Sequence, residues 1–182
     1  LATSSGPVPV SSEATPITFG NPDFQQRSLA DRVTQLAAGK PNSGAWDMLT
    51  VNETGPHKGR YLLTVFETGQ SGVQRTDLLT EKTETIWQSP VPGGHVAFDA
   101  SYWTPWGTFI TAEESWSTAA GGSNSPYGRL FEFKNPITAD GIMLPLSTSS
   151  NDDADFVHRT VVPRVSHEGI QFDKDGNMYF ID

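Results

Sequence analysis

The sequence contains no cysteine among its 182 residues. Disulfide bonds, thiolate metal ligands and a cysteine nucleophile are therefore excluded, whereas the cellular compartment stays open because exported bacterial proteins also often lack cysteine. Long hydrophobic runs are missing as well, since no apolar stretch approaches the roughly 18 residues that a membrane-spanning helix needs. We therefore expect no membrane span.

Positive charge is also scarce. The chain has 12 Lys and Arg residues against 21 Asp and Glu residues, a formal net charge of −9 and a pI of about 4.8. Binding to nucleic-acid phosphates depends on a basic surface, so nucleic-acid binding is not expected, and the charge favours divalent cations as partners. Aromatic residues are plentiful by contrast, with 5 Trp, 4 Tyr and 10 Phe, which is enough to build the core of a globular protein.

Residues 1–43 differ in composition from the rest of the chain. They are rich in Ser, Thr and Pro and contain one helix-compatible stretch, Asp31–Ala38. We interpret them as an arm that lies across a domain formed by residues 44–182. The chain begins with Leu1 rather than Met, which either removal of a signal peptide or trimming of the chain would explain. We expect an exported protein, either secreted or periplasmic.

From residue 44 onward, short apolar and aromatic runs separated by Gly, Pro, Asn and Asp are typical of an all-β chain. A repeat runs through it: a first strand, a turn, a Gly with one variable residue, a second strand, and an acid. Four strands per unit at a spacing of roughly 50 residues fit the blades of a β-propeller. The first two strands of the three units are predicted at Ala45–Val51 and Gly59–Thr64, His95–Asp99 and Gly107–Thr111, and His167–Asp173 and Gly176–Ile181.

The predicted propeller is incomplete. A closed ring needs about 4 to 8 blades, whereas this length holds about two blades and the start of a third. We therefore interpret residues 44–182 as the N-terminal part of a larger propeller, whose remainder is missing or supplied by another chain. A β-sandwich is the alternative fold.

The repeat also predicts where the acids gather. The innermost strands of propeller blades line one channel, so acids at equivalent strand ends would meet there, and hard cations such as Ca²⁺ prefer such oxygen ligands. Glu113 and Glu114 have no Lys or Arg beside them in the sequence to neutralise them. Alternatively, each acid is simply a solvated charge at a strand end. The predicted calcium ligands are Glu67, Glu113, Glu114, Glu168 and Asp182.

Other polar residues admit two interpretations. Arg129 and Arg164 lie beside the acidic strands, where each could pair with a carboxylate or hold an anionic group of a substrate. His167 could be a ligand or an acid/base, but a single His in a strand is more often a core residue. The segment Asp173–Asn177 resembles the start of a calcium loop, although an Asp-Gly hairpin turn explains it better. No zinc-protease or esterase motif is present.

Several segments from about residue 59 onward resemble the PhoX-type alkaline phosphatases and their propeller relatives. These segments are Tyr61–Glu67, Gly72–Leu78, Thr104–Glu114 and Arg164–Glu168. The resemblance implies an exported propeller that cleaves phosphomonoesters with calcium and iron held by channel carboxylates, without a Ser or Cys nucleophile. It also implies that Glu113, Glu114 and Glu168 are metal ligands.

One position departs from the family pattern. At the place where this chain has Ala112-Glu113-Glu114, the corresponding segment of the characterised phosphatases resembles Cys-Glu-Glu. An Ala side chain has no donor atom for iron. Two hypotheses follow: a calcium-dependent phosphomonoesterase with Arg164 as a candidate phosphate-binding residue, or a non-catalytic, calcium-stabilised propeller that acts as a binding or scaffolding module. The sequence favours the first hypothesis, and its substrate is not defined.

Overall fold

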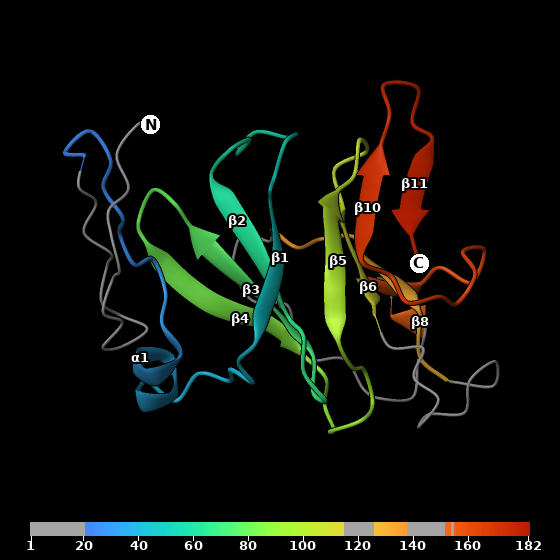
Figure 1. Ribbon diagram of the computed structural model, residues 1–182, viewed down its shortest axis with the longest axis horizontal. Helices are drawn as coiled ribbons and strands as arrows, with labels where there is room; N and C mark the ends of the chain where they lie inside the picture. Colours follow the sequence, from blue (N-terminus) through green and yellow to red (C-terminus); the bar gives the residue numbers. More distant parts are fainter. Residues whose placement is uncertain (1–20, 115–125, 138–151, 154) are drawn as a thin grey trace.

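The computed structural model describes residues 21–114, 126–137, 152–153 and 155–182, and these ranges form three antiparallel sheets with one short helix. The first sheet has the order β1-β2-β3-β4, the second β5-β6-β7-β9-β8, and the third is the hairpin β10-β11 (Figure 1). The strands are β1 Trp46–Val51, β2 Tyr61–Phe66, β3 Gly72–Asp77, β4 Lys82–Gln88, β5 Phe98–Trp103, β6 Phe109–Glu113, β7 Leu130–Phe133, β8 Asp152–Asp153, β9 Phe156–His158, β10 Gly169–Phe172 and β11 Met178–Ile181.

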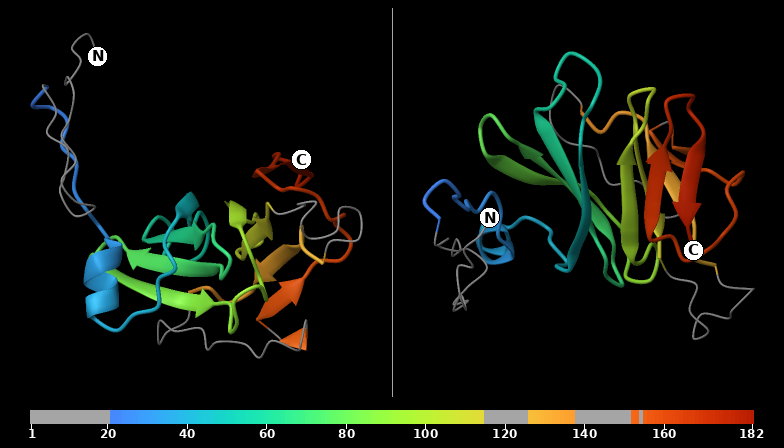
Figure 2. Two further views of the ribbon diagram at one scale, coloured as in Figure 1. Left: turned by 60° about the horizontal axis from the view of Figure 1, so that its bottom comes forward. Right: turned by 45° about the horizontal axis from the view of Figure 1, so that its top comes forward.

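The fold is all-β, as the sequence predicts. Within the described ranges the sheets close neither a barrel nor a propeller ring. The first strands of the three sheets, β1, β5 and β10, lie side by side, with β5 between the other two (Figures 1 and 2). No helix in the described part of the chain has the length and hydrophobicity to cross a membrane.

A glycine precedes the second strand of each sheet at an equivalent position. Gly59, Gly107 and Gly176 each lie two residues before the second strand of a sheet, with φ values of 78°, 90° and 83°. Only glycine adopts such angles without a steric penalty, so the predicted repeat of Gly and strand is confirmed. The first strand of the second unit is shifted, however, because β5 occupies Phe98–Trp103 rather than the predicted His95–Asp99.

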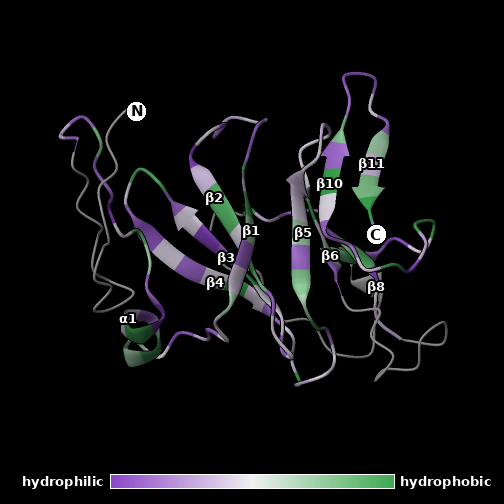
Figure 3. Cartoon of the chain, in the orientation of Figure 1, coloured by the Kyte–Doolittle hydropathy of each residue, from purple (hydrophilic) through white to green (hydrophobic). Residues whose placement is uncertain are grey.

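Two hydrophobic clusters hold the sheets together. The larger one joins the first sheet to the second through rings such as Trp87, Phe98 and Phe131, and the smaller one joins the second sheet to the third through Ile110, Ile170 and their neighbours. Hydrophobic and hydrophilic residues interleave along the strands (Figure 3), as expected where successive side chains point to opposite faces. Each sheet thus packs face to face against the next.

The predicted helical stretch is confirmed as α1, Arg32–Ala37. Asp31 caps it, since its carboxylate accepts a hydrogen bond of 2.8 Å from the backbone N–H of Thr34. A buried amide contact ties α1 to the segment that enters β1, because Asn42 Nδ2 donates to Gln35 Oε1 at 2.6 Å.

Candidate functional site

An acidic cluster lies where the first and second sheets meet. Glu67 directly follows β2, and its N–H donates to the carbonyl of Ala45 at 2.8 Å; Glu114 directly follows β6, and its N–H donates to the carbonyl of Ala97 at 2.8 Å. The two sheets are joined at the same end by a bond from Ala97 N to Thr68 O of 2.8 Å. Equivalent backbone bonds therefore bring Glu67 and Glu114 to one place.

Backbone strain marks this end of both sheets. Ala45 and Ala97 have positive φ values of 41° and 46°. A left-handed conformation costs an L-residue roughly 1–2 kcal/mol, so surrounding contacts must hold both residues in it. Each strained alanine is followed by an aromatic residue and then by an aspartate, Asp47 or Asp99.

Asp47 and Asp99 complete a cluster of four carboxyl groups. Burial, together with the nearby carboxyl groups of Glu114 and Asp47, raises the pKa of Glu67 to about 7. Burial and the Asp47 carboxyl, with weaker repulsion from Glu114 and Glu67, raise the pKa of Asp99 to about 7. We call Asp47, Glu67, Asp99 and Glu114 the acidic cluster. None of its members belongs to an ion pair among the described residues.

The cluster differs from the predicted set at Glu113. Successive residues of a strand point to opposite faces, and the carboxylate of Glu113 binds Arg129 through Oε2 to Nε at 2.8 Å and Oε1 to Nη2 at 2.6 Å. The backbone N–H groups of Arg129 and Val96 also donate to it, at 3.0 and 3.1 Å. The expectation that no Lys or Arg neutralises Glu113 is therefore wrong, and this buried carboxylate is occupied by four N–H donors.

The remaining predicted residues lie on or near the third sheet. Glu168 is exposed, with its N–H bonded to the carbonyl of Ile181. Asp182 accepts a hydrogen bond of 2.8 Å from the N–H of Ser166, whose hydroxyl donates to the carbonyl of Glu114. The exposed guanidinium of Arg164 donates to the backbone carbonyls of Pro126 and Tyr127. The third sheet thus contacts the end of β6, where Glu114 lies.

His167 and Asp173 have structural roles. His167 is fully buried, its ring lies edge-on to Phe180 at 5.3 Å between centroids, and burial lowers its pKa. Asp173 accepts hydrogen bonds of 2.9 Å from the N–H groups of Asp175 and Asn177 within the β10–β11 turn. The contacts therefore favour a core position for His167 and a hairpin turn for Asp173–Asn177.

A metal at the acidic cluster would be bound through oxygen. Four carboxyl groups are the donors that calcium prefers, so the donor chemistry fits calcium. Ala112, which would have to be a cysteine to ligate iron, is fully buried against Ile110 and Leu130, and a thiolate-bound iron does not fit here. As the side chains lie, no group of three or more His, Asp or Glu residues in the described ranges is placed to hold a metal ion.

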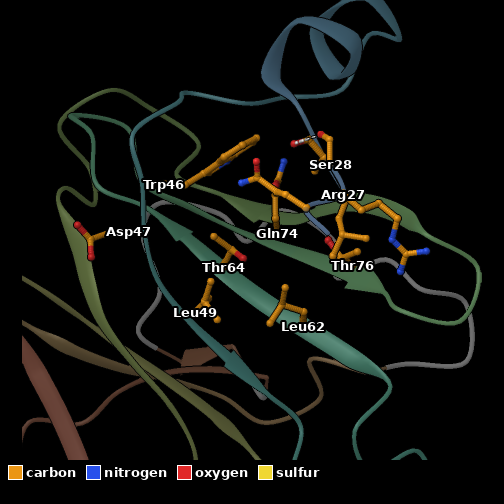
Figure 4. Close-up of a pocket in the computed structure, with 12 residues that line it drawn as sticks. Arg27, Ser28, Trp46, Asp47, Leu49, Leu62, Thr64, Gln74 and Thr76 are labelled. Carbon is orange, nitrogen blue, oxygen red and sulfur yellow. Dashed lines mark hydrogen bonds between the residues drawn. The ribbon is translucent and has the colours of Figure 1, made fainter. Parts of the chain in front are cut away.

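A cavity of about 440 Å³ lies between the first sheet and residues 26–30, and Asp47 of the acidic cluster is one of its lining residues. Its lining includes Trp46, Leu49, Leu62 and Gln74. In Figure 4, Asp47 lies on the other side of β1 from Gln74. The cavity therefore shares one lining residue, Asp47, with the acidic cluster.

Asp47 and Asp99 are not among the predicted ligands, although the sequence carries a signal for them. Each of these first strands is directly preceded by Ala and begins with an aromatic residue and Asp, at residues 45–47 and 97–99. The repeat predicts ligands at the acids that follow the second strands, whereas Asp47 and Asp99 lie within the first strands. Comparisons with protein-family models, with curated proteins and with solved structures found no match to this chain.

Proposed function

We propose that this chain is part of an exported, calcium-dependent phosphomonoesterase of the PhoX-like propeller type, with its metal held by the acidic cluster. The observation that carries the proposal is the meeting of four carboxyl groups from two sheets without an ion-pair partner among the described residues. Repulsion between close carboxylates is relieved either by protonation or by a bound cation. At neutral pH a divalent cation relieves it without protonation.

The stacked sheets support the propeller part of the proposal. Equivalent sheets pack face to face through clusters of core residues, as propeller blades do, and β1, β5 and β10 lie side by side. On the outer strand of the described hairpin, Tyr179 and Ile181 are 58% and 62% exposed. Further strands, from the remainder of the propeller or from another chain, would cover this apolar surface.

The residues around the cluster have separable roles in this proposal. Asp47, Glu67, Asp99 and Glu114 bind the cation, while the pair of Glu113 with Arg129 fixes the end of β6 and so orients Glu114. When bound, calcium would neutralise the phosphate ester and make its phosphorus more electrophilic. A role of Arg164 in binding the phosphate stays a prediction.

The test is hydrolysis of p-nitrophenyl phosphate by the full-length protein. We expect turnover with calcium, loss of turnover with a chelator, and a rate lowered at least about 100-fold in the double variant Asp47→Asn/Asp99→Asn. Asp175→Asn removes an exposed acid of the hairpin turn and should leave the rate unchanged. Absence of turnover in the calcium-loaded protein, persisting when Ala112→Cys is made and iron is supplied, would overturn the enzymatic proposal.

A second candidate function is a calcium-stabilised binding or scaffolding module without catalysis. Two residues favour it. Ala112 has no atom that could bind a metal, and the carboxylate of Glu113 is already paired with Arg129. In this case calcium still stabilises the folded protein, and the free energy of unfolding rises by about 2.7 kcal/mol at a free calcium concentration of 100 times Kd. The melting temperature rises with it. A calcium-dependent melting temperature with no hydrolysis would select this candidate.

A further inference from the structure

A second cavity, of about 500 Å³, lies at the opposite end of the first two sheets from the acidic cluster. Three loops form it: residues 52–57 after β1, residues 103–107 between β5 and β6, and residues 134–137 after β7. The acidic cluster lies near the start of β1 and β5, whereas these loops follow their ends. The six residues of β1 separate the two places by about 17–20 Å, and the cavity is therefore a separate site.

A fixed tryptophan ring forms one wall of the cavity. Trp106 is 59% exposed, yet its indole N–H donates to Oε1 of the buried Glu132 at 2.8 Å, and its ring meets Phe172 edge-on at 5.3 Å. Burial opposes ionisation of Glu132, but hydrogen bonds from Thr108, Trp106 and Arg159 hold the pKa of this carboxyl below its ordinary value. Glu132 is thus a charged acceptor that positions an exposed aromatic surface.

The loops around this ring are held in place from within the protein. Asn52 is buried; its Nδ2 donates to the carbonyl of His57 at 2.7 Å, and its Oδ1 accepts from the N–H of Tyr61 at 2.8 Å. The indole N–H of Trp103 donates to Thr54 Oγ1 at 2.8 Å, which ties the first loop to the second. The third loop is fixed by Arg75, whose guanidinium donates to the carbonyl of Pro136 at 2.9 Å. A cavity with walls fixed in this way is preorganised for a ligand.

Two polar side chains at the cavity keep their nitrogen atoms available, although the ring of His57 lies edge-on to Tyr61 at 6.0 Å between centroids. Neither the imidazole of His57 nor the ammonium of Lys134 has an ion-pair partner or a side-chain hydrogen bond in the part of the chain that the structure describes. Both residues are exposed. Two such nitrogen donors beside an exposed indole mark a place where an anionic group is favoured.

We propose that this cavity binds a saccharide whose ring carries a negatively charged substituent. The exposed indole of Trp106 stacks against the C–H face of the sugar ring, and Lys134 and His57 bind the charged group. A volume of about 500 Å³ lies within the range of roughly 300–1,000 Å³ typical of small-molecule sites. A neutral sugar would leave both nitrogen donors without an anionic partner, and the net negative charge of the chain disfavours a nucleic acid.

The charged group has two possible sources, a carboxylate, as in uronic acids, or a phosphate, as in sugar phosphates. Calorimetric titration of the full-length protein with digalacturonate and with glucose 6-phosphate distinguishes them, and maltose serves as the neutral control. We expect one acidic ligand to bind and maltose to bind at least about tenfold more weakly, because a hydrogen bond to a charged group contributes about 1.5–3 kcal/mol. The acidic ligand that binds more tightly identifies the source.

Matched variants test whether binding occurs at this cavity. Trp106→Ala should weaken binding about tenfold through loss of the stacked ring, and Lys134→Ala should weaken it and reduce its salt dependence. Trp46→Ala removes a partly exposed tryptophan of the other cavity, and Lys174→Ala removes an exposed lysine of the hairpin turn; neither should change the affinity. Circular dichroism checks the fold of each variant.

Titrations in the presence of a chelator keep this inference independent of the proposed phosphatase activity, because the acidic cluster then holds no metal. Binding that survives the chelator and is weakened by Trp106→Ala supports the saccharide site whether or not the protein hydrolyses phosphate esters. The proposal is overturned if neither acidic ligand binds at millimolar concentration, if maltose binds equally well, or if Trp106→Ala binds as tightly as the unaltered protein.

Discussion

Among the single residues of this chain, Glu113 and Arg129 are ones whose replacement should strongly destabilise the fold, because they form a buried ion pair. The Glu113 side chain is 0% exposed and the Arg129 side chain 15%. Breaking a buried pair by removing one partner costs about 3–5 kcal/mol, since the other charge stays buried without compensation.

We therefore expect Arg129→Gln to lower the melting temperature by about 6–20 °C, at roughly 2–4 °C per kcal/mol for a chain of this size. Arg164→Gln is the matched control, because Arg164 is exposed and binds only backbone carbonyls in the described structure; it should change the melting temperature little. Differential scanning calorimetry measures both. Equal effects of the two variants would show that the buried pair is not essential.

A second residue, His95, makes the fold sensitive to acid. Its ring lies among Trp87, Phe131 and Phe156, and burial, followed by repulsion from Arg129 and His158, lowers its pKa to about 4. Because the unfolded chain binds a proton near pH 6.5 and the folded protein does so only near pH 4, the contribution of the neutral ring is present above pH 6.5 and is lost as the pH falls towards 4.

His95→Phe keeps a ring in this place but does not titrate. The melting temperature of the variant relative to the unaltered protein should therefore rise as the pH falls from 7 to 4. Thermal unfolding followed at several pH values measures this difference. A difference that stays constant over the range would contradict a neutral, buried His95.

At the scale of elements, glycines set where strands begin. Gly59 has φ +78° and no atom within 4 Å of an added Cβ, whereas Gly69 has the same open surroundings without a positive φ. Gly59→Ala should therefore cost about 1–2 kcal/mol from backbone strain alone, while Gly69→Ala should be neutral or slightly stabilising. Because an added Cβ meets no other atom at either position, chemical denaturation of both variants isolates the backbone strain, and an equal loss in both would rule out strain at Gly59.

The sequence predicted elements better than it predicted contacts. Glycines and alternating apolar residues carry the strand signal locally, so the sequence predicts the strands that follow Gly59, Gly107 and Gly176. The partner of Glu113 is not predicted, because Arg129 lies 16 residues further along the chain and directly precedes β7, the strand that pairs with β6. The prediction places Glu113 and Glu114 at one metal site, although the two-residue period of a strand sends neighbouring side chains to opposite faces.

At the scale of the whole molecule, the acidic cluster couples two sheets electrostatically. The pKa values of Glu67 and Asp99 are both raised to about 7, from ordinary values near 4. Such groups contribute stability that is fully present below the unfolded pKa and is lost as the pH rises through about 7. Without metal, the junction of the two sheets should therefore weaken between about pH 5 and 8.

Glu67→Gln removes one of these charges. In the presence of a chelator, the melting temperature of this variant relative to the unaltered protein should rise as the pH increases from 5 to 8, and added calcium should stabilise the unaltered protein more than the variant. Asp175→Asn provides the control, with no such dependence on pH. A Glu67→Gln variant that responds to pH and calcium as the unaltered protein does would contradict a coupled acidic cluster.

The unequal size of the two hydrophobic clusters has a consequence for how the chain opens. The first two sheets share the larger cluster of buried aromatic rings, whereas the β10–β11 hairpin contacts its neighbours through the smaller one and leaves Tyr179 and Ile181 exposed. Regions with few buried apolar contacts open at low free energy without global unfolding. Amide hydrogens of β10 and β11 should accordingly exchange with deuterium first, and those of β2 and β6 last, so that the hairpin behaves as a separate unit of local unfolding.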